Sequence, residues 1–491
     1  MANKLYVFGI GGTGSRVIKA LTMLLASGIK LDNGFDTIVP IIIDPDTANG
    51  DLNRTADILT KYQNIVNKAG DNNSFFGTNI KTLTQLTNKN VANLSNNFKF
   101  SIDGSGKKFG ESIDYNGLDD ENKSLIDLLF SKDNIEADMT VGFKGNPNIG
   151  SVVLNQIFDS KEYLAFANSF NDGDAIFIIS SIFGGTGASG FPLLLKNLRK
   201  NDPSKLNSDK ISKSTIGAIS YLPYFKVADS STDEKEIDSA TFFGKAKAAL
   251  SYYEHAIFKN KNSVNAFYYI GDHANNNEKY APGKMDQKNK AHFVELAGAI
   301  AIIDFVTKIP QIDQNNGNLP LEFGVADDNG KLKFNSLGPE TKEKLRLPLS
   351  KIYLFDKFIR KSFDNLLNSP GAYNSVKGIK KEFYNADFYK SNLIPYFDYF
   401  KEWMDEMEEN NMSFKPFHDN QEHDSLFDFI IDNEVSKGNF IRRNRATADI
   451  IINDANQLIS KGELDGETQE SRFIKVFDKL LENQLKNNIL N

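Results

Sequence analysis

Two glycine-rich loops, each directly after an apolar run, contain the residues of this sequence that are best suited to chemistry. The first is GIGGTGS at residues 9–15, and the second is FGGTGASG at residues 183–190. Glycine lets the backbone adopt left-handed conformations, so successive N–H groups can point at one anion, and a following helix adds partial positive charge. The two loops therefore predict a phosphate chain held from both sides. The candidate contacts are Gly11, Gly12, Thr13, Gly14 and Ser15 in the first loop and Gly184, Gly185, Thr186 and Gly187 in the second.

A third glycine-containing loop lies between these two in the sequence. In VGFKGNPNIGS, at residues 141–151, Gly145 and Asn146 stand just before a predicted helix. The pattern by itself also fits an ordinary turn. Beside the other two loops, it offers backbone amides that could surround a terminal phosphate.

The elements around these loops predict the fold class. Apolar, strand-like runs alternate with helix-like segments, which is typical of an α/β fold whose parallel sheet has helices on both faces. The strand-like runs are Leu5–Phe8, Ile38–Ile43, Ala175–Ile179, Ser214–Ser220 and Val264–Ile270. Amphipathic helices are expected at Asn53–Lys68 and Glu121–Ser131, between these runs.

A chain of 491 residues fits more than one domain. We expect a nucleotide-binding domain at 1–286, a central linking helix at 287–310, a second α+β domain at 311–440 and a helical extension at 441–491. The central helix would end at Pro310, since proline stops a helix. A hairpin is expected over Leu319–Phe334, with its turn at Asp328-Asn329-Gly330.

Composition excludes several classes of protein. The net charge is -7 and no basic stripe is present, so there is no nucleic-acid signature. The chain contains no cysteine, which excludes disulfides and thiolate chemistry, and its five histidines show no metal-binding spacing. No apolar stretch is long enough to span a bilayer, and the first residues do not form a signal peptide. We therefore expect a cytoplasmic protein.

Five segments, taken in order, resemble the successive nucleotide loops of the tubulin and FtsZ superfamily. They are GIGGTGS, IIIDPDTANGD, GNPNIG, FGGTGASGFP and AISYLPYF. The resemblance implies a GTPase that binds GTP or GDP with Mg²⁺ and assembles head to tail as a homopolymer. It also implies that Asp44, Asp46 and Asn49 form the second loop, which contacts phosphate through its backbone or through Mg²⁺ and its waters.

The same resemblance assigns two positions near the base and a catalytic role. Arg16 stands where FtsZ proteins carry an Asn that contacts the base, so guanine selectivity does not carry over. Phe293, at the start of the central helix, would stack on the base. Hydrolysis would be completed by an acidic residue of the next subunit, for which Asp304, Asp313 and Glu322 are the candidates, although none lies in a matching motif.

Other readings remain open. The segment from Leu5 to Arg54 also resembles ThiF-type adenylating enzymes, in which Asn53 and Arg54 would help to hold ATP. Against this, such enzymes carry cysteines and have no counterpart of FGGTGASG. A dinucleotide oxidoreductase is a further alternative, although the sequence shows no set of His, Lys or Tyr residues arranged for hydride transfer. A nucleotide-binding scaffold with little turnover is another, and the helices after Glu340 would then offer a surface for a protein partner.

Overall fold

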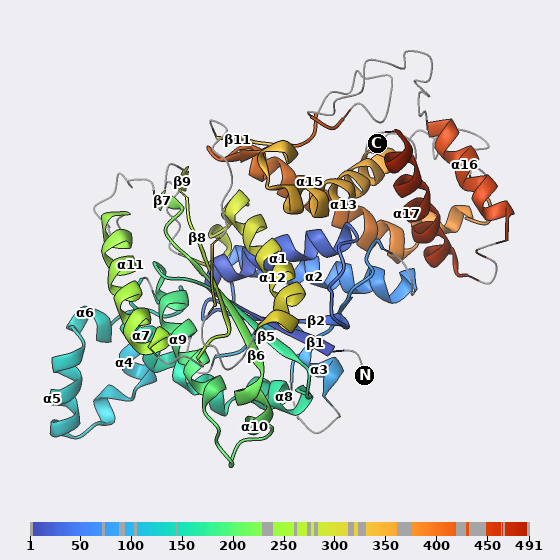
Figure 1. Ribbon diagram of the computed structural model, residues 1–491. Helices are drawn as coiled ribbons and strands as arrows, with labels where there is room; N and C mark the ends of the chain where they lie inside the picture. Colours follow the sequence, from blue (N-terminus) through green and yellow to red (C-terminus); the bar gives the residue numbers. More distant parts are fainter. Residues whose placement is uncertain are drawn as a thin grey trace.

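A parallel sheet of eight strands forms the centre of the computed structural model (Figure 1). The model describes residues 3–70, 74–87, 94–102, 106–143, 145–227, 239–259, 263–272, 276–278, 283–312, 319–322, 330–360, 376–418, 429–431, 448–462, 464 and 467–488. The strands are β1 (Asn3–Ile10), β2 (Phe35–Ile43), β3 (Asn79–Ile80), β4 (Lys99–Phe100), β5 (Ala175–Ser181), β6 (Thr215–Tyr221), β8 (Ala266–Ile270) and β10 (Leu319–Glu322). Their order is β10-β8-β6-β5-β1-β2-β3, with β4 also paired to β2.

Both faces of the sheet are covered by helices, so its strands are apolar throughout. Along β1, Leu5 and Val7 face one hydrophobic core, whereas Tyr6 and Phe8 face another. This alternation follows from the two-residue period of a strand. The first core contains α1 (Gly11–Ala26), α2 (Gly50–Ala69) and α12 (Phe293–Lys308). The second contains α7 (Pro147–Val153), α8 (Lys161–Ser169), α9 (Gly185–Arg199) and α11 (Ser239–Tyr253). The predicted fold class is therefore confirmed.

The order of the strands reverses direction between β1 and β5. The chain runs outward from β1 through β2 on one side, and from β5 through β6 and β8 on the other. Because α1 lies on one face and α9 on the other, the carboxyl ends of β1 and β5 lie between the starts of these two helices. Ligands of open α/β sheets bind at such a switch point.

Shorter helices complete the first part of the chain. They are α3 (Leu83–Leu86), α4 (Phe109–Ser112), α5 (Asp120–Leu129), α6 (Lys132–Ile135) and α10 (Ser208–Lys213). Two further short strands, β7 (Phe225–Val227) and β9 (Asn276–Glu278), pair in parallel. Among the residues described here, no helix combines the length and the apolar character that a membrane crossing requires.

The C-terminal part of the chain is mostly helical in the segments that the structure describes. Its helices are α13 (Pro339–Phe358), α15 (Ile394–Glu408), α16 (Ala448–Ser460) and α17 (Gln469–Asn488). Figure 1 shows them gathered beyond α1 and α2, on the side away from α9 and α11. They share the first core, because Tyr396 of α15 packs against Tyr62 of α2 and its hydroxyl donates to the carbonyl of Thr22 at 3.1 Å.

The hairpin expected over Leu319–Phe334 is wrong. β10 instead pairs in parallel with β8 at the edge of the main sheet. The second strand of the expected hairpin, β11 (Lys331–Leu332), pairs in parallel with β12 (Ser413–Phe414), a partner about eighty residues later in the chain. Asp328 and Asn329 of the expected turn lie outside the described residues, and Gly330 has a φ of +73°. Strand pairing is decided by which apolar faces meet in the folded protein.

Candidate functional site

The first and fourth loops touch at the switch point. Gly11 has a φ of +73°, a left-handed conformation that favours glycine. A Cβ built on Gly11 would lie 3.6 Å from the Cβ of Thr186 and 3.9 Å from the amide nitrogen of Gly187. The loops that follow β1 and β5 therefore lie next to each other; that they hold a phosphate chain stays a prediction.

Both loops lead into long helices whose first turns carry no side-chain cap. α1 begins at Gly11 after Ile10, and α9 begins at Gly185 after Gly184; neither preceding residue caps its helix. By contrast, Asn49 caps α2 and His292 caps α12. Amide groups at an uncapped helix start need another acceptor, and together with the helix dipole they favour an anion. Two such helix starts lie close together here, since Gly11 of α1 is next to Thr186 and Gly187 of α9.

Some of the loop glycines are required for packing and not for ligand contact. A Cβ on Gly14 would lie 2.5 Å from the backbone of Gly9, and one on Gly187 would lie 2.5 Å from the carbonyl oxygen of Ser181. These contacts show how closely α1 and α9 approach the strands before them. The hydroxyl of Ser15 is buried and donates to the carbonyl of Gly11 at 3.3 Å, so it holds the loop in shape.

The third loop lies against the fourth. A Cβ on Gly185 would lie 3.0 Å from the amide nitrogen of Gly145 and 3.1 Å from that of Asn146. Gly145 has a φ of +71°, and Asn146 precedes the first residue of α7. The structure therefore brings the first, third and fourth loops together at the start of α9. Of the third-loop amides, that of Asn146 donates to the carbonyl of Phe143 at 2.7 Å.

The second loop, at the end of β2, is buried and largely occupied by structural hydrogen bonds. The side chain of Asn49 accepts from the amides of Asp51 and Leu52, at 2.9 and 3.2 Å. Asp46 accepts from the amide of Lys284 at 2.6 Å. Asp44 is 6% exposed, and one of its oxygens accepts from the amide of Asp46 at 3.0 Å.

Burial raises the pKa of Asp44 to about 7. The hydrogen bond from the amide of Asp46 opposes this effect, and the nearby carboxylates of Asp46 and Asp51 add to it. Since the side chain ionises near neutral pH, it can become the negatively charged partner of a cation. No cluster of three or more His, Asp or Glu able to hold a metal occurs among the described residues. A divalent ion would thus take most of its ligands from phosphate and water, as Mg²⁺ commonly does.

We expect Asp44→Asn to remove a pH-dependent loss of stability. The folded protein keeps the Asp44 proton up to a pH of about 7, whereas the unfolded chain loses it near 3.8, so ionisation opposes folding across this range. Raising the pH from 5 to 8 should cost the ligand-free wild type roughly 2–3 kcal/mol through this group, at about 1.4 kcal/mol per pKa unit. Urea denaturation of both proteins at the two pH values measures the difference. An identical pH dependence in the variant would contradict the assignment.

Arg16 lies in a buried ion-pair network beside the first loop. It is 3% exposed and contacts Glu295 at 2.5 Å, Asp51 at 2.7 Å and the hydroxyl of Tyr224 at 2.7 Å. It also donates to the hydroxyl of Thr13 at 3.4 Å. Burial opposes the charge of Arg16, but Tyr224, Glu295 and Asp51 outweigh it and hold the guanidinium pKa above its usual value. The side chain is therefore engaged in joining α1, α2 and α12.

The network continues to the C-terminal helices. Arg54 pairs with Asp51 at 3.2 Å and with Glu406 of α15 at 2.5 Å, and Lys19 pairs with Glu406 at 3.1 Å. The adenylating reading would need Arg54 at ATP, but this side chain is directed at carboxylates on α2 and α15. The ion pairs place the phosphate loops and the helical part of the chain in a fixed relation.

Phe293 lies in the core between α12 and β12. Its side chain is 3% exposed, and its ring centroid is 5.4 Å from that of Phe414. A base could stack on Phe293 only after these two rings separated. Stacking stays a prediction from the sequence.

Asp304 is the acidic candidate for catalysis whose side chain the structure describes, and it does not lie at the glycine loops. Asp304 is in the last part of α12, where it accepts from Tyr268 at 2.8 Å and pairs with Lys308 at 2.6 Å. Asp313 lies outside the described residues, as does the side chain of Glu322, whose backbone belongs to β10. α12 starts beside the first loop and extends about 24 Å, since a helix rises about 1.5 Å per residue.

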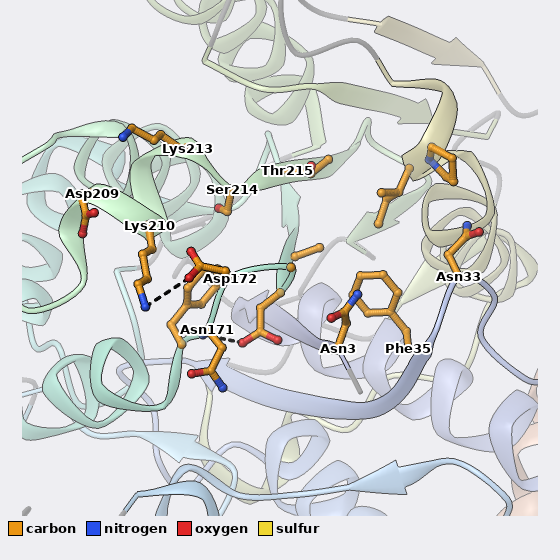
Figure 2. Close-up of a pocket in the computed structure, with 16 residues that line it drawn as sticks. Asn3, Asn33, Phe35, Asn171, Asp172, Asp209, Lys210, Lys213, Ser214 and Thr215 are labelled. Carbon is orange, nitrogen blue, oxygen red and sulfur yellow. Dashed lines mark hydrogen bonds and ion pairs between the residues drawn. The ribbon is translucent and has the colours of Figure 1, made fainter. Parts of the chain in front are cut away.

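The far end of α12 is at the amino edge of the sheet. A pocket of about 610 Å³ opens there (Figure 2), lined by the first residues of β1, β2, β5 and β6 and by Ile309 and Pro310. Its polar residues include Asn3, Asn33, Asp172 and Lys210, the last two forming an ion pair at 3.4 Å. This pocket is on the opposite edge of the sheet from the glycine loops.

Sequence reasoning missed Asp51, Glu295, Tyr224 and Glu406 as partners of Arg16 and its neighbours. A signal was present, because Arg16 and Glu295 each interrupt a strongly apolar helix, and a charge inside a buried helix needs a partner. The identity of that partner was not accessible, since Arg16 and Glu295 are 279 positions apart.

No protein-family model matches the sequence, and no curated protein sequence matches it significantly. Solved structures of CetZ, FtsZ and TubZ proteins, which belong to the tubulin and FtsZ superfamily, do match the chain at low sequence identity. CetZ2 from Haloferax volcanii, a GTPγS-bound protofilament, is 14% identical; the match covers 62% of this chain and 58% of that chain, with a TM-score of 0.30.

An empty FtsZ dimer from M. jannaschii is 17% identical, with 63% and 54% of the two chains covered and a TM-score of 0.28. TubZ from Bacillus thuringiensis serovar israelensis, in a GTPγS-form protofilament, is 12% identical, with 67% and 59% covered and a TM-score of 0.26. The chain spans less than two thirds of the length of each of these structures. At these TM-scores, no residue role in this protein follows from the matches.

Proposed function

We propose that this protein binds GTP with Mg²⁺ and hydrolyses it when it assembles head to tail into filaments. The observation that carries the proposal is the convergence of the first, third and fourth loops around two uncapped helix starts, at the switch point of a parallel sheet. Uncapped helix starts that lie close together are suited to a chain of phosphates. The choice of guanine rests on the resemblance of the five ordered sequence segments to tubulin and FtsZ loops.

Within this proposal, the phosphates are contacted mainly by the backbone amides of Gly11, Gly12, Thr13, Gly145, Gly184, Gly185 and Thr186. Asn146, whose amide donates to the carbonyl of Phe143 at 2.7 Å, would contact them through its side chain. When Mg²⁺ is bound, it neutralises part of the negative charge of the phosphates. Asp44, buried at the end of β2 and able to ionise near neutral pH, is placed to contact that ion or its waters. Arg16 acts on the site indirectly, by holding α1 against α2 and α12.

The position of Asp304 supports assembly as a condition for hydrolysis. Within one subunit, Asp304 is in the last part of α12 and contacts Tyr268 of β8 and Lys308, whereas the first loop lies beside the start of that helix. In a head-to-tail arrangement, the amino edge of one sheet would face the carboxyl edge of the next. An acidic residue at the end of α12 would then approach the nucleotide of a neighbouring subunit.

We expect turnover per subunit to depend on protein concentration. Phosphate release from GTP is measured across a dilution series, with ATP as the control nucleotide. Near-zero turnover in dilute protein, rising above a threshold concentration, is the expected result, because the catalytic site is completed between subunits. Turnover that stays flat would contradict assembly-coupled hydrolysis, and ATP-dependent release of pyrophosphate would favour an adenylating enzyme.

One observation favours a second function, that of a nucleotide-binding scaffold with slow turnover. Asp304 is engaged by Lys308 and Tyr268, which both contact the Oδ2 atom of its carboxylate, at 2.6 and 2.8 Å. GTP binding without phosphate release at any protein concentration would support this alternative. The C-terminal helices would then be the surface for a protein partner.

A further inference from the structure

Lys245 of α11 places an amino group directly at the third loop. Its Nζ donates to the carbonyl oxygen of Gly145 at 2.5 Å, and the side chain is half-buried. A Cβ on Gly145 would lie 2.9 Å from this nitrogen. The glycine therefore leaves the space that the amino group occupies, and its left-handed backbone presents the carbonyl to it.

The same short loop faces the start of α9. The amide nitrogens of Gly145 and Asn146 are 3.0 and 3.1 Å from the position of a Cβ on Gly185. The amino group of Lys245 and the start of α9 therefore both lie next to Gly145. Helix α11 is fixed in this position because Tyr253, at its other end, packs on Phe191 of α9 with ring centroids 5.2 Å apart.

The charge of Lys245 is not neutralised by a carboxylate within the described part of the chain. Burial lowers the pKa of its amino group, which means that the charged form is less well solvated than in water. A neutral carbonyl compensates this loss only in part. An anion at the adjoining amides would compensate it more fully, since hydrogen bonds between ionised partners are the stronger ones.

We infer that Lys245 contacts the terminal phosphate of a nucleoside triphosphate, and that it is a residue by which this protein distinguishes triphosphate from diphosphate. The inference rests on the proposed function, because it assumes that the three loops hold phosphates. A lysine acts here as a mobile point charge on a flexible stem. It can exchange the carbonyl of Gly145 for a phosphate oxygen, and α11 would respond to that exchange.

Titration calorimetry of the full chain with GDP and with the non-hydrolysable β,γ-imido analogue of GTP, both with Mg²⁺, tests the inference. Lys245→Gln should weaken binding of the triphosphate analogue by roughly 10- to 100-fold, the value of one hydrogen bond between charged groups. Binding of GDP should be unchanged. Lys245→Arg, which keeps the positive charge, should recover part of the preference for triphosphate.

Lys247→Gln is the matched control, because Lys247 is exposed on the same helix. It should leave both affinities unchanged. If the wild type binds both nucleotides and Lys245→Gln keeps their affinity ratio, the inference about Lys245 is overturned while the proposed function stands. An equal loss for both nucleotides would also overturn it. If the wild type binds neither nucleotide, the proposed function fails and the inference fails with it.

Discussion

Gly185→Ala should abolish tight nucleotide binding while leaving the protein folded. The added methyl group would lie 3.0 and 3.1 Å from the amide nitrogens of Gly145 and Asn146, so it would occupy the space in which the third and fourth loops meet a phosphate. The amide of Asn146 donates to the carbonyl of Phe143 at 2.7 Å, so the amide of Gly145 is the one that the methyl group would displace from a phosphate. Losing one hydrogen bond to a charged oxygen, at about 1.5–3 kcal/mol, corresponds to a loss of affinity of roughly 10- to 100-fold, and the volume of the methyl group adds to that loss. Calorimetry with GTP analogue and GDP measures this loss.

Two other glycines make the result specific. Gly106 is exposed with open space where a Cβ would be, so Gly106→Ala should leave both binding and stability unchanged. Gly187→Ala would place a Cβ 2.5 Å from the carbonyl oxygen of Ser181, so this variant should lose stability in addition to affinity. Normal affinity in folded Gly185→Ala would remove the start of α9 from the phosphate site.

Glu295→Gln should strongly destabilise the whole protein. The carboxylate of Glu295 is 1% exposed and accepts hydrogen bonds from Arg16, from the hydroxyl of Tyr224 at 2.8 Å and from the amide of His292 at 3.1 Å. An amide in its place carries no charge and turns an N–H group toward these donors. Removing one partner of a buried ion pair costs about 3–5 kcal/mol. Urea denaturation measures the change in the free energy of unfolding.

An exposed ion pair provides the control for this effect. Lys108 and Glu136 are 2.6 Å apart, with side chains 52% and 68% exposed. Glu136→Gln should change the free energy of unfolding by less than about 1 kcal/mol, as exposed pairs usually do. A similar cost for Glu136→Gln and Glu295→Gln would mean that burial of the network is not the cause.

A double-mutant cycle measures the energy of the interaction between Arg16 and Glu295. Removing Arg16 and Glu295 together, as Arg16→Met with Glu295→Leu, leaves Asp51 still paired with Arg54 at 3.2 Å. The double variant should therefore cost less than the sum of the two single variants, because no charge is left buried without a partner. Additive costs would indicate that Arg16 and Glu295 do not act as a pair.

The ion-pair network also connects the first glycine loop to the C-terminal helices. It joins the start of α1, which carries the first phosphate loop, to α15 through Asp51, Arg54 and Glu406. These ion pairs connect Arg16, beside the first loop, to the C-terminal helices through an unbroken series of contacts. The connection consists of direct contacts between charged groups. The variants described above measure how much these contacts contribute to the free energy of unfolding.

The local features of this protein were determined by its sequence. A glycine-rich loop between an apolar strand and a helix depends on residues that are neighbours in the chain, and so does the alternation of strands and helices. For this reason, the strands near Leu5, Ile38, Ala175 and Ser214 and the α/β class could be predicted without a structure. The first, third and fourth loops were identified in the same way.

Only the tertiary structure decided which distant residues meet. β11 pairs with β12 instead of returning along β10, because apolar surfaces from remote segments close over each other. Arg16, placed at the base by its position in a motif, is engaged by Glu295 and Asp51, and Lys245 reaches Gly145 across 100 positions. Partners of buried charges are chosen by the requirement to compensate lost hydration in three dimensions, and no local pattern of residues encodes that choice.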